Sequence, residues 1–144
     1  MRFLFVIAFL SVSFSSHCQI GKAKSYENPT EVGRLYGGKH VLAYHDIGGG
    51  RRQYILSFWN EEYINVQDVK TLSFEATQED FDYFYSFLLE GYKANKVRSL
   101  EVGNAELVTY PDNLGYMDVG VNFKDGTTGK LIFSKRQLAK LFGK

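Results

Sequence analysis

The stretch from Thr77 to Lys96 most restricts the possible fold, because it carries the longest helical pattern in the chain. At about 100° per residue, its apolar residues gather on one side of a helix and most of its charged residues on the other. Asp80 follows Thr77 at the spacing of a capping box, in which two side chains satisfy free backbone N–H groups at the helix start. The pattern predicts a helix over about 78–93 that packs one face against a sheet.

The remaining chain alternates between apolar and polar residues in short runs bounded by turn residues, which indicates β-strands. Gly103-Asn104 suits a tight hairpin turn, and one long bulged strand is the alternative there. Ser134 and Gln137 repeat the capping-box spacing and predict a short C-terminal helix over about 135–142. The expected strands cover 35–45, 51–59, 69–76, 97–102, 105–110, 114–124 and 131–133, with a further short strand at 63–66.

These elements predict an α+β fold, with a meandering antiparallel sheet of about six strands and both helices on one face. Each of two runs of strands ends in a helix, so a duplicated βββα unit is the alternative organisation. Leu72-Ser73-Phe74 before the long helix can be aligned with Leu131-Ile132-Phe133 before the short one. A single domain over 35–144 is expected in either case, because the chain is too short for two separate cores.

Residues 1–18 have the layout of a secretory signal peptide: Arg2, then an apolar run, then small and polar residues. The apolar run is too short to cross a bilayer, so no transmembrane segment is expected in the mature chain. Cleavage after Cys18 leaves a polar, flexible leader over 19–34 and a secreted or periplasmic protein. The alternative is a lipoprotein anchored through Cys18, which the preceding Ser16 and His17 disfavour.

Composition narrows the possible chemistry. Cys18 is the only cysteine, so a mature chain without it forms no disulfide and no thiolate metal site. The chain has 17 Lys and Arg against 16 Asp and Glu, and these numbers become equal once Arg2 is removed. This balance argues against a nucleic-acid partner, which requires a concentrated basic surface. His40 and His45 fall on opposite faces of a strand, so they predict no shared metal, and no cofactor is expected.

The loop over 46–52 combines a carboxylate, three glycines and two guanidinium groups, from Asp46, Arg51 and Arg52. Backbone N–H groups of a glycine-rich turn and paired arginines can bind an anion. Phosphate-binding loops of this kind open a helix, whereas a strand follows here. A hairpin turn with solvated arginines is therefore the plainer interpretation.

Aromatic residues give the second candidate surface. Trp59, Tyr63 and Tyr116 could form a patch on the sheet face that the helices leave open, suited to stacking on sugar rings or to a protein partner. Packing in the core or at a sheet edge is the simpler interpretation of the same residues.

The sequence thus predicts a non-catalytic binding module for a protein or a small ligand, acting through the open sheet face or the 46–52 loop. One alternative is an inhibitor or immunity protein that blocks an enzyme with that loop. The other is a small hydrolase that uses His45 as a base and Asp46 to orient it, although neighbours on a strand face apart and no nucleophile is marked.

Overall fold

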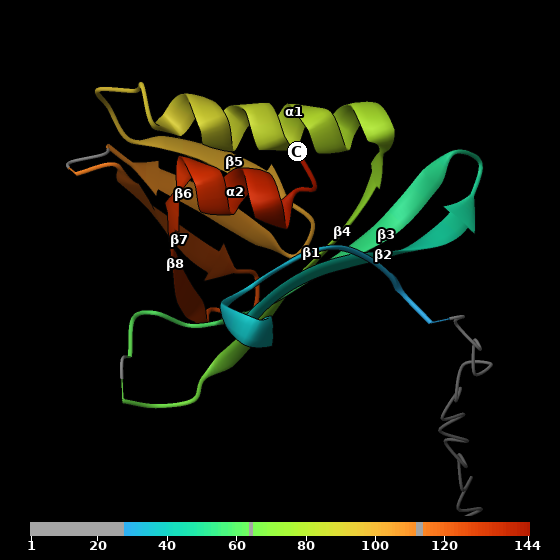
Figure 1. Ribbon diagram of the computed structural model, residues 1–144, viewed down its shortest axis with the longest axis horizontal. Helices are drawn as coiled ribbons and strands as arrows, with labels where there is room; N and C mark the ends of the chain where they lie inside the picture. The colour runs from blue at the N-terminus through green and yellow to red at the C-terminus, as the bar shows by residue number, and fades with distance from the viewer. Residues whose placement is uncertain (1–27, 64, 112–113) are drawn as a thin grey trace, which may run out of the picture.

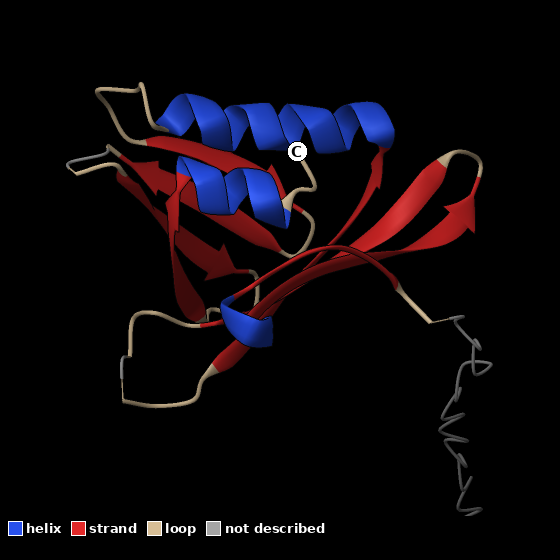
Figure 2. Ribbon diagram, in the orientation of Figure 1, coloured by secondary structure: helices blue, strands red, loops and turns tan. Residues whose placement is uncertain are grey.

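The computed structural model describes residues 28–63, 65–111 and 114–144. The predicted signal peptide with Cys18 lies outside the described residues, as does the predicted leader up to residue 27. The described chain forms two antiparallel sheets of four strands each, together with two helices and a short 3-10 turn, η1 (Tyr36–Gly38) (Figures 1 and 2).

The same order of elements occurs twice along the chain, because each four-stranded meander is followed by a helix. The first unit comprises β1 (Thr30–Leu35), β2 (His40–Gly48), β3 (Arg51–Trp59), β4 (Val69–Thr77) and α1 (Gln78–Gly91). The second comprises β5 (Arg98–Val102), β6 (Ala105–Tyr110), β7 (Tyr116–Phe123), β8 (Thr128–Ser134) and α2 (Lys135–Leu141).

The α+β class is confirmed, but the expectation of one sheet of about six strands is wrong. The first sheet gains β1 at the end of the predicted flexible leader, and a register shift between Glu31 and Gly33 explains why its sequence shows no regular alternation. The βββα unit is likewise corrected to four strands and a helix. Tyr63 and Val66 lie in a loop rather than in the short strand expected at 63–66, where residue 64 is outside the described chain.

Local predictions from turn and capping residues are confirmed. Both capping boxes form, Thr77 with Asp80 at the start of α1 and Ser134 with Gln137 at the start of α2. Hydrogen bonds from Thr77 lower the pKa of the Asp80 carboxyl. Strands β5 and β6 pair across Gly103-Asn104, so the single bulged strand is excluded. Helix α1 ends at Gly91, slightly before the predicted end, and α2 ends at Leu141.

The two helices lie beside each other and cover both sheets (Figure 1). Helix α1 contacts β4 and β6, while α2 contacts β8 and reaches back to β1 and β2. Buried residues of both units form one hydrophobic cluster. At its centre Phe81 of α1 stacks on Tyr54 of β3 at 4.4 Å between ring centroids and on Phe142 at 5.2 Å. The helices therefore join the two sheets through a shared aromatic core.

Asn104 joins the second sheet to the free edge of β4. Its side-chain Oδ1 accepts a hydrogen bond from the Ser73 backbone N–H at 2.9 Å, and its own N–H donates to the Ser73 carbonyl at 3.2 Å. Its Nδ2 donates to the Thr71 carbonyl at 3.3 Å. Asn104 thus pairs with backbone N–H and C=O groups of β4 that have no neighbouring strand on that side.

Gly103 is required for this contact. Its φ of +55° belongs to the left-handed region, and a Cβ at this position would lie only 1.9 Å from the Ser73 carbonyl oxygen. The turn of the β5–β6 hairpin can therefore approach β4 only with glycine here.

Replacement of Asn104 by alanine should remove all hydrogen bonds of its side chain to β4. Because this site is partly open to water, we expect the free energy of unfolding to fall by about 1–2 kcal/mol. Urea unfolding followed by circular dichroism measures the change. The control is Asn122→Ala, on the exposed face of β7. Equal stability of the two variants would contradict the role given to Asn104.

Candidate functional site

A pocket of about 370 Å³ opens where the end of β3 and the following loop meet β8. Its aromatic walls come from Tyr36, Trp59 and Tyr63, and its polar lining includes Lys39, His40 and Glu61. Tyr36 and Tyr63 are both about half exposed, at 50% and 53%. The pocket therefore combines exposed rings with a small number of polar groups, as ligand sites commonly do.

His40 and Glu61 form a pair at the pocket. The His40 ring is buried, and its Nε2 lies 3.0 Å from Glu61 Oε1. Because a carboxylate only accepts hydrogen bonds, Nε2 carries a proton in this contact. Among the described residues the Nδ1 atom of His40 is buried without a hydrogen-bond partner. The ring packs edge-on against Tyr36 and Phe133, which fixes the imidazole and through it the position of Glu61.

The backbone of Tyr36 has a conformation that residues other than glycine rarely adopt. Its φ is +51°, and Gly37 and Gly38 continue the left-handed backbone. Left-handed non-glycine residues cost about 1 kcal/mol or more and are concentrated at functional sites. The Tyr36 hydroxyl accepts a hydrogen bond from Gln137 Nε2 at 2.6 Å. Burial and then the negative charge of Glu61 raise the pKa of the Tyr36 hydroxyl.

Lys39 and Trp59 form a cation–π pair on the pocket wall. The Lys39 Nζ lies 4.3 Å from the centroid of the Trp59 ring. The backbone N–H of Trp59 donates to the Lys39 carbonyl at 3.0 Å, so the end of β3 and the start of β2 are held together here. Trp59 therefore presents a ring face that an ammonium group already occupies.

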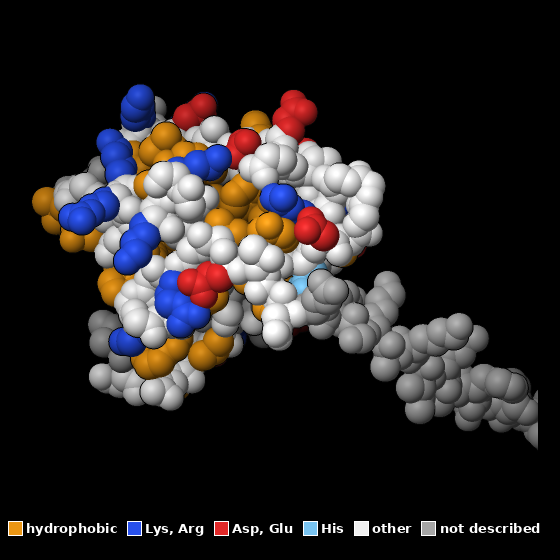
Figure 3. Space-filling view, turned by 45° about the vertical axis from the view of Figure 1, so that its right-hand side comes forward, with side chains coloured by type: hydrophobic (Ala, Val, Ile, Leu, Met, Phe, Trp, Pro, Cys, Tyr) orange, Lys and Arg blue, Asp and Glu red, His pale blue; other side chains and the backbone are white. Residues whose placement is uncertain are grey.

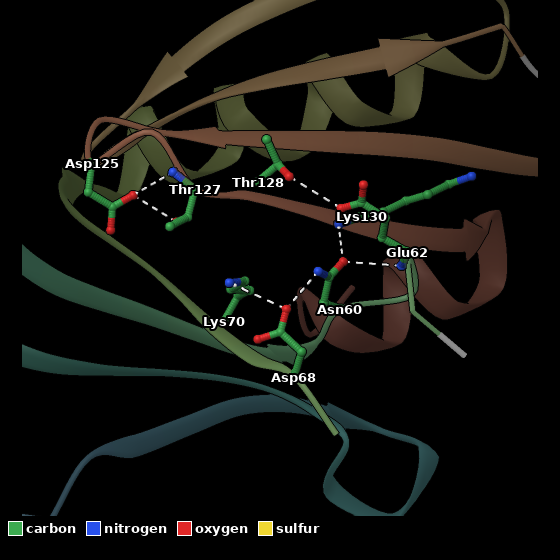
Figure 4. A network of polar contacts seen from close by, with 8 residues as sticks. All are labelled: Asn60, Glu62, Asp68, Lys70, Asp125, Thr127, Thr128 and Lys130. Carbon is green, nitrogen blue, oxygen red and sulfur yellow. Dashed lines mark hydrogen bonds and ion pairs between the residues drawn. The ribbon is translucent and has the colours of Figure 1, made fainter. Parts of the chain in front are cut away.

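Asn60 holds the loop that carries Glu61 and Tyr63 (Figure 4). The asparagine is buried, and its Oδ1 accepts hydrogen bonds from the Lys130 and Glu62 backbone N–H groups at 2.8 and 3.1 Å. Its Nδ2 donates to Asp68 Oδ2 at 2.8 Å. The Glu61 N–H donates to the Lys130 carbonyl at 2.9 Å. The loop thereby pairs with the free edge of β8.

Two further hollows lie beside the pocket on the open face of the second sheet. A neighbouring hollow of about 500 Å³ shares Ile132 with it and is lined by Tyr110 and Tyr116. A third hollow, of about 430 Å³, shares Tyr110 and Asp118 with the second. The pocket and the second hollow are therefore neighbours at Ile132, and the second and third hollows are neighbours at Tyr110 and Asp118.

Figure 3 shows hydrophobic side chains reaching the surface at the lower left of that view, near the loop that follows β3 in Figure 1. Lys and Arg side chains lie close to them, with carboxylates between. The most exposed apolar residues at the hollows are Leu114, at 91%, and Val66, at 62%. Apolar patches of this kind mark interaction sites more often than ordinary surface does.

The structure separates the two sets of predicted site residues. Trp59 and Tyr63 line one pocket, and Tyr116 lines the adjoining hollow. Asp46, Arg51 and Arg52 lie at the other end of strands β2 and β3, and the arginines are about 23–26 Å from Trp59 along β3 at about 3.3 Å per residue. The two sets therefore do not form one site.

The arginines of the 46–52 loop have partners within the protein. Arg52 Nε lies 3.2 Å from Asp46 Oδ1, and its Nη1 donates to Gln78 at 2.9 Å. Arg51 Nη2 lies 3.1 Å from a carboxylate oxygen of Glu75. These contacts fit the interpretation of a hairpin turn with surface ion pairs better than that of a prepared anion clamp.

The sequence alone does not indicate which further residues line the pocket, namely Tyr36, Lys39, His40, Glu61 and Ile132. The register that pairs His40 with Phe58 brings the start of β2 beside the end of β3, and a hairpin alignment could have revealed this. The left-handed Tyr36 and the approach of Ile132 from β8 give no local signal, because they depend on contacts between distant parts of the chain.

Comparison of the chain with protein-family models, curated proteins and solved structures gives no match. Within the described ranges, no helix is long and apolar enough to cross a membrane. The described residues also contain no group of three or more His, Cys, Asp or Glu side chains that could hold a metal ion. The description of the site therefore depends on its geometry alone.

Asp68 makes the stability of the pocket loop dependent on pH. A hydrogen bond from Asn60, followed by contacts with Lys70, lowers the pKa of the Asp68 carboxyl. A carboxyl whose pKa is lowered by folding contributes stability above its unfolded-state pKa, and this contribution is lost as the pH falls through the folded-state value.

We therefore expect Asp68→Asn to be less stable than the original protein at pH 7, and the difference to narrow below about pH 4. Urea unfolding at pH 7 and pH 3 measures both differences. All other carboxylates are the same in the two proteins, so their protonation changes both stabilities equally and cancels in the difference. A difference that stays constant with pH would contradict the role given to Asp68.

Proposed function

We propose that this protein is a secreted or periplasmic non-catalytic binding module that holds its ligand in the pocket at Trp59 and along the open face of β6–β8. The observation that supports this most strongly is the series of three neighbouring hollows, in which the aromatic pocket shares Ile132 with the second and the second shares Tyr110 and Asp118 with the third. Neighbouring hollows with mostly apolar surfaces are suited to a ligand that enters the pocket at one end and lies across the sheet.

The composition of the site supports binding rather than catalysis. Tyr36, Trp59, Tyr63, Tyr110 and Tyr116 offer rings that gain contact area with little loss of side-chain entropy. The few polar groups are held by contacts within the protein, as the His40–Glu61 pair and the 2.7 Å contact between Lys130 and Asp118 illustrate. Rigid polar groups among exposed rings provide orientation and specificity at small energetic cost.

The β2–β3 hairpin supports a second candidate function, inhibition of a partner enzyme by an inserted loop. Figure 1 shows this hairpin extending away from the helices. At its tip Ile47 is 41% exposed, and Gly48, Gly49 and Gly50 all have positive φ. An exposed aliphatic side chain on a narrow turn is suited to entering a cleft in a partner.

Affinity capture from the secreted and envelope fractions of the source organism, with the tagged chain from Gln19 to Lys144, tests the proposal. We expect Trp59→Ala combined with Tyr116→Ala to lose a stoichiometric partner, because both rings would contact it. Tyr83→Ala is the matched control, since Tyr83 is 62% exposed on α1. Unchanged capture by the double variant would contradict the proposed site.

The same experiment with a triple variant, in which Ile47, Arg51 and Arg52 are all replaced by alanine, distinguishes binding through the pocket from binding through the hairpin. Capture that survives these changes at the hairpin and is lost with the aromatic variant supports the pocket. Capture with the opposite dependence would identify the hairpin as the binding element. Thermal unfolding of each variant verifies that it remains folded.

A further inference from the structure

We propose that the ligand of the pocket carries an ammonium group, which lies against the rings of Tyr36, Trp59 and Tyr63 and pairs with Glu61. This inference depends on the proposed function, because it names the chemistry of the ligand that the same pocket takes. Aromatic rings around a cation, with a carboxylate nearby, form the usual recognition site for alkylammonium groups.

The contact between Lys39 and Trp59 supports this ligand class directly. An ammonium group of the protein itself lies 4.3 Å from the centre of the Trp59 ring. Lys39 is exposed and its stem is flexible, so its Nζ can move into solvent when a ligand arrives. The Lys39 ammonium thus occupies a position that a ligand ammonium would take.

Glu61 supplies the negative charge. The hydrogen bond from His40, whose ring is buried between Tyr36 and Phe133, fixes the Glu61 carboxylate at the pocket. Burial is the main cause of the raised pKa of the Tyr36 hydroxyl, and the negative charge of Glu61 is the second cause. The charge of Glu61 therefore acts on the side of the pocket formed by Tyr36. A carboxylate and the negative faces of aromatic rings both favour a cation over an anion.

A neutral polyol is the main competing ligand, since aromatic rings also stack on sugars. The two classes differ in their dependence on Glu61, because removal of its charge weakens the binding of a cation but leaves the stacking of a neutral ring system unchanged. The pocket is lined by one basic and one acidic side chain, Lys39 and Glu61, beside its aromatic residues. A cation can displace the first and pair with the second.

Choline and 3,3-dimethyl-1-butanol test the inference as a matched pair, because the alcohol has the same shape with carbon in place of the charged nitrogen. Trp59 is the only tryptophan of the chain, so its fluorescence reports on the pocket alone. We expect choline to change the emission saturably and the alcohol to bind at least about fivefold more weakly. Sodium chloride at equal ionic strength controls for salt.

Two variants test the roles of the charges on Glu61 and Lys39. Glu61→Gln keeps an oxygen that accepts from His40 and removes the charge, so choline binding should weaken about fivefold. Glu79→Gln is the matched control, because Glu79 is exposed in the first turn of α1 and lines none of the three hollows. Lys39→Ala removes the competing ammonium and should tighten choline binding about threefold.

Equal binding of choline and the neutral alcohol, or equal effects of the Glu61 and Glu79 changes, would overturn the ammonium inference and leave the aromatic binding site intact. No saturable response to choline in either the original protein or the Lys39→Ala variant would also overturn it, while partner capture tests the proposed function separately. Nα-acetyl-lysinamide, measured in parallel, distinguishes a lysine side chain from a quaternary ammonium group as the source of the cation.

Discussion

The structure depends on hydrogen bonds that complete the edges of two sheets where they meet. A strand at the end of a sheet leaves backbone N–H and C=O groups unpaired, and their burial without partners is costly. Asn104 of the second unit pairs with β4, the last strand of the first sheet. Asn60 of the first unit and its neighbour Glu61 pair with β8, the last strand of the second sheet. Each unit therefore completes the edge of the other.

This reciprocal pairing explains where the candidate site lies. Asn60 directly follows Trp59, and the loop it fixes carries Glu61 and Tyr63 to the pocket. Because the same loop binds the edge of β8, it also brings the pocket next to Ile132 and the open face of the second sheet. The contact that joins the two units thus also builds the surface that we propose binds the ligand. The shared aromatic core beneath the helices keeps both sheets in place around it.

The sequence predicted those features that depend on neighbouring residues. Alternation of apolar and polar residues predicted strands at 51–59 and 69–76, which correspond to β3 and β4, and capping residues predicted the starts of both helices. Trp59 and Tyr63 line the pocket and Tyr116 lines the adjoining hollow, and their grouping into one binding surface stays a prediction.

Features that depend on distant contacts were not predictable in this way. The contacts that join the two sheets, through Asn104 and Asn60, link residues that are 31 and 70 positions apart in the chain. Strand β1 was not predicted because its bulge disrupts the alternation of apolar and polar residues. The burial of His40 likewise depends on Phe133 and on the unusual backbone of Tyr36. These contacts are properties of the assembled fold and have no local signature.

The most direct test of this account is whether the two units unfold together. The amide signals of buried Leu42 in β2 and Leu56 in β3 report on the first unit, and those of buried Val119 and Val121 in β7 report on the second. Measured in parallel across a urea titration, the two probes should give one coincident transition, because the shared core and the reciprocal edge pairing make the units interdependent. Two separate transitions would show that each sheet and helix is stable without the other, and would contradict the account.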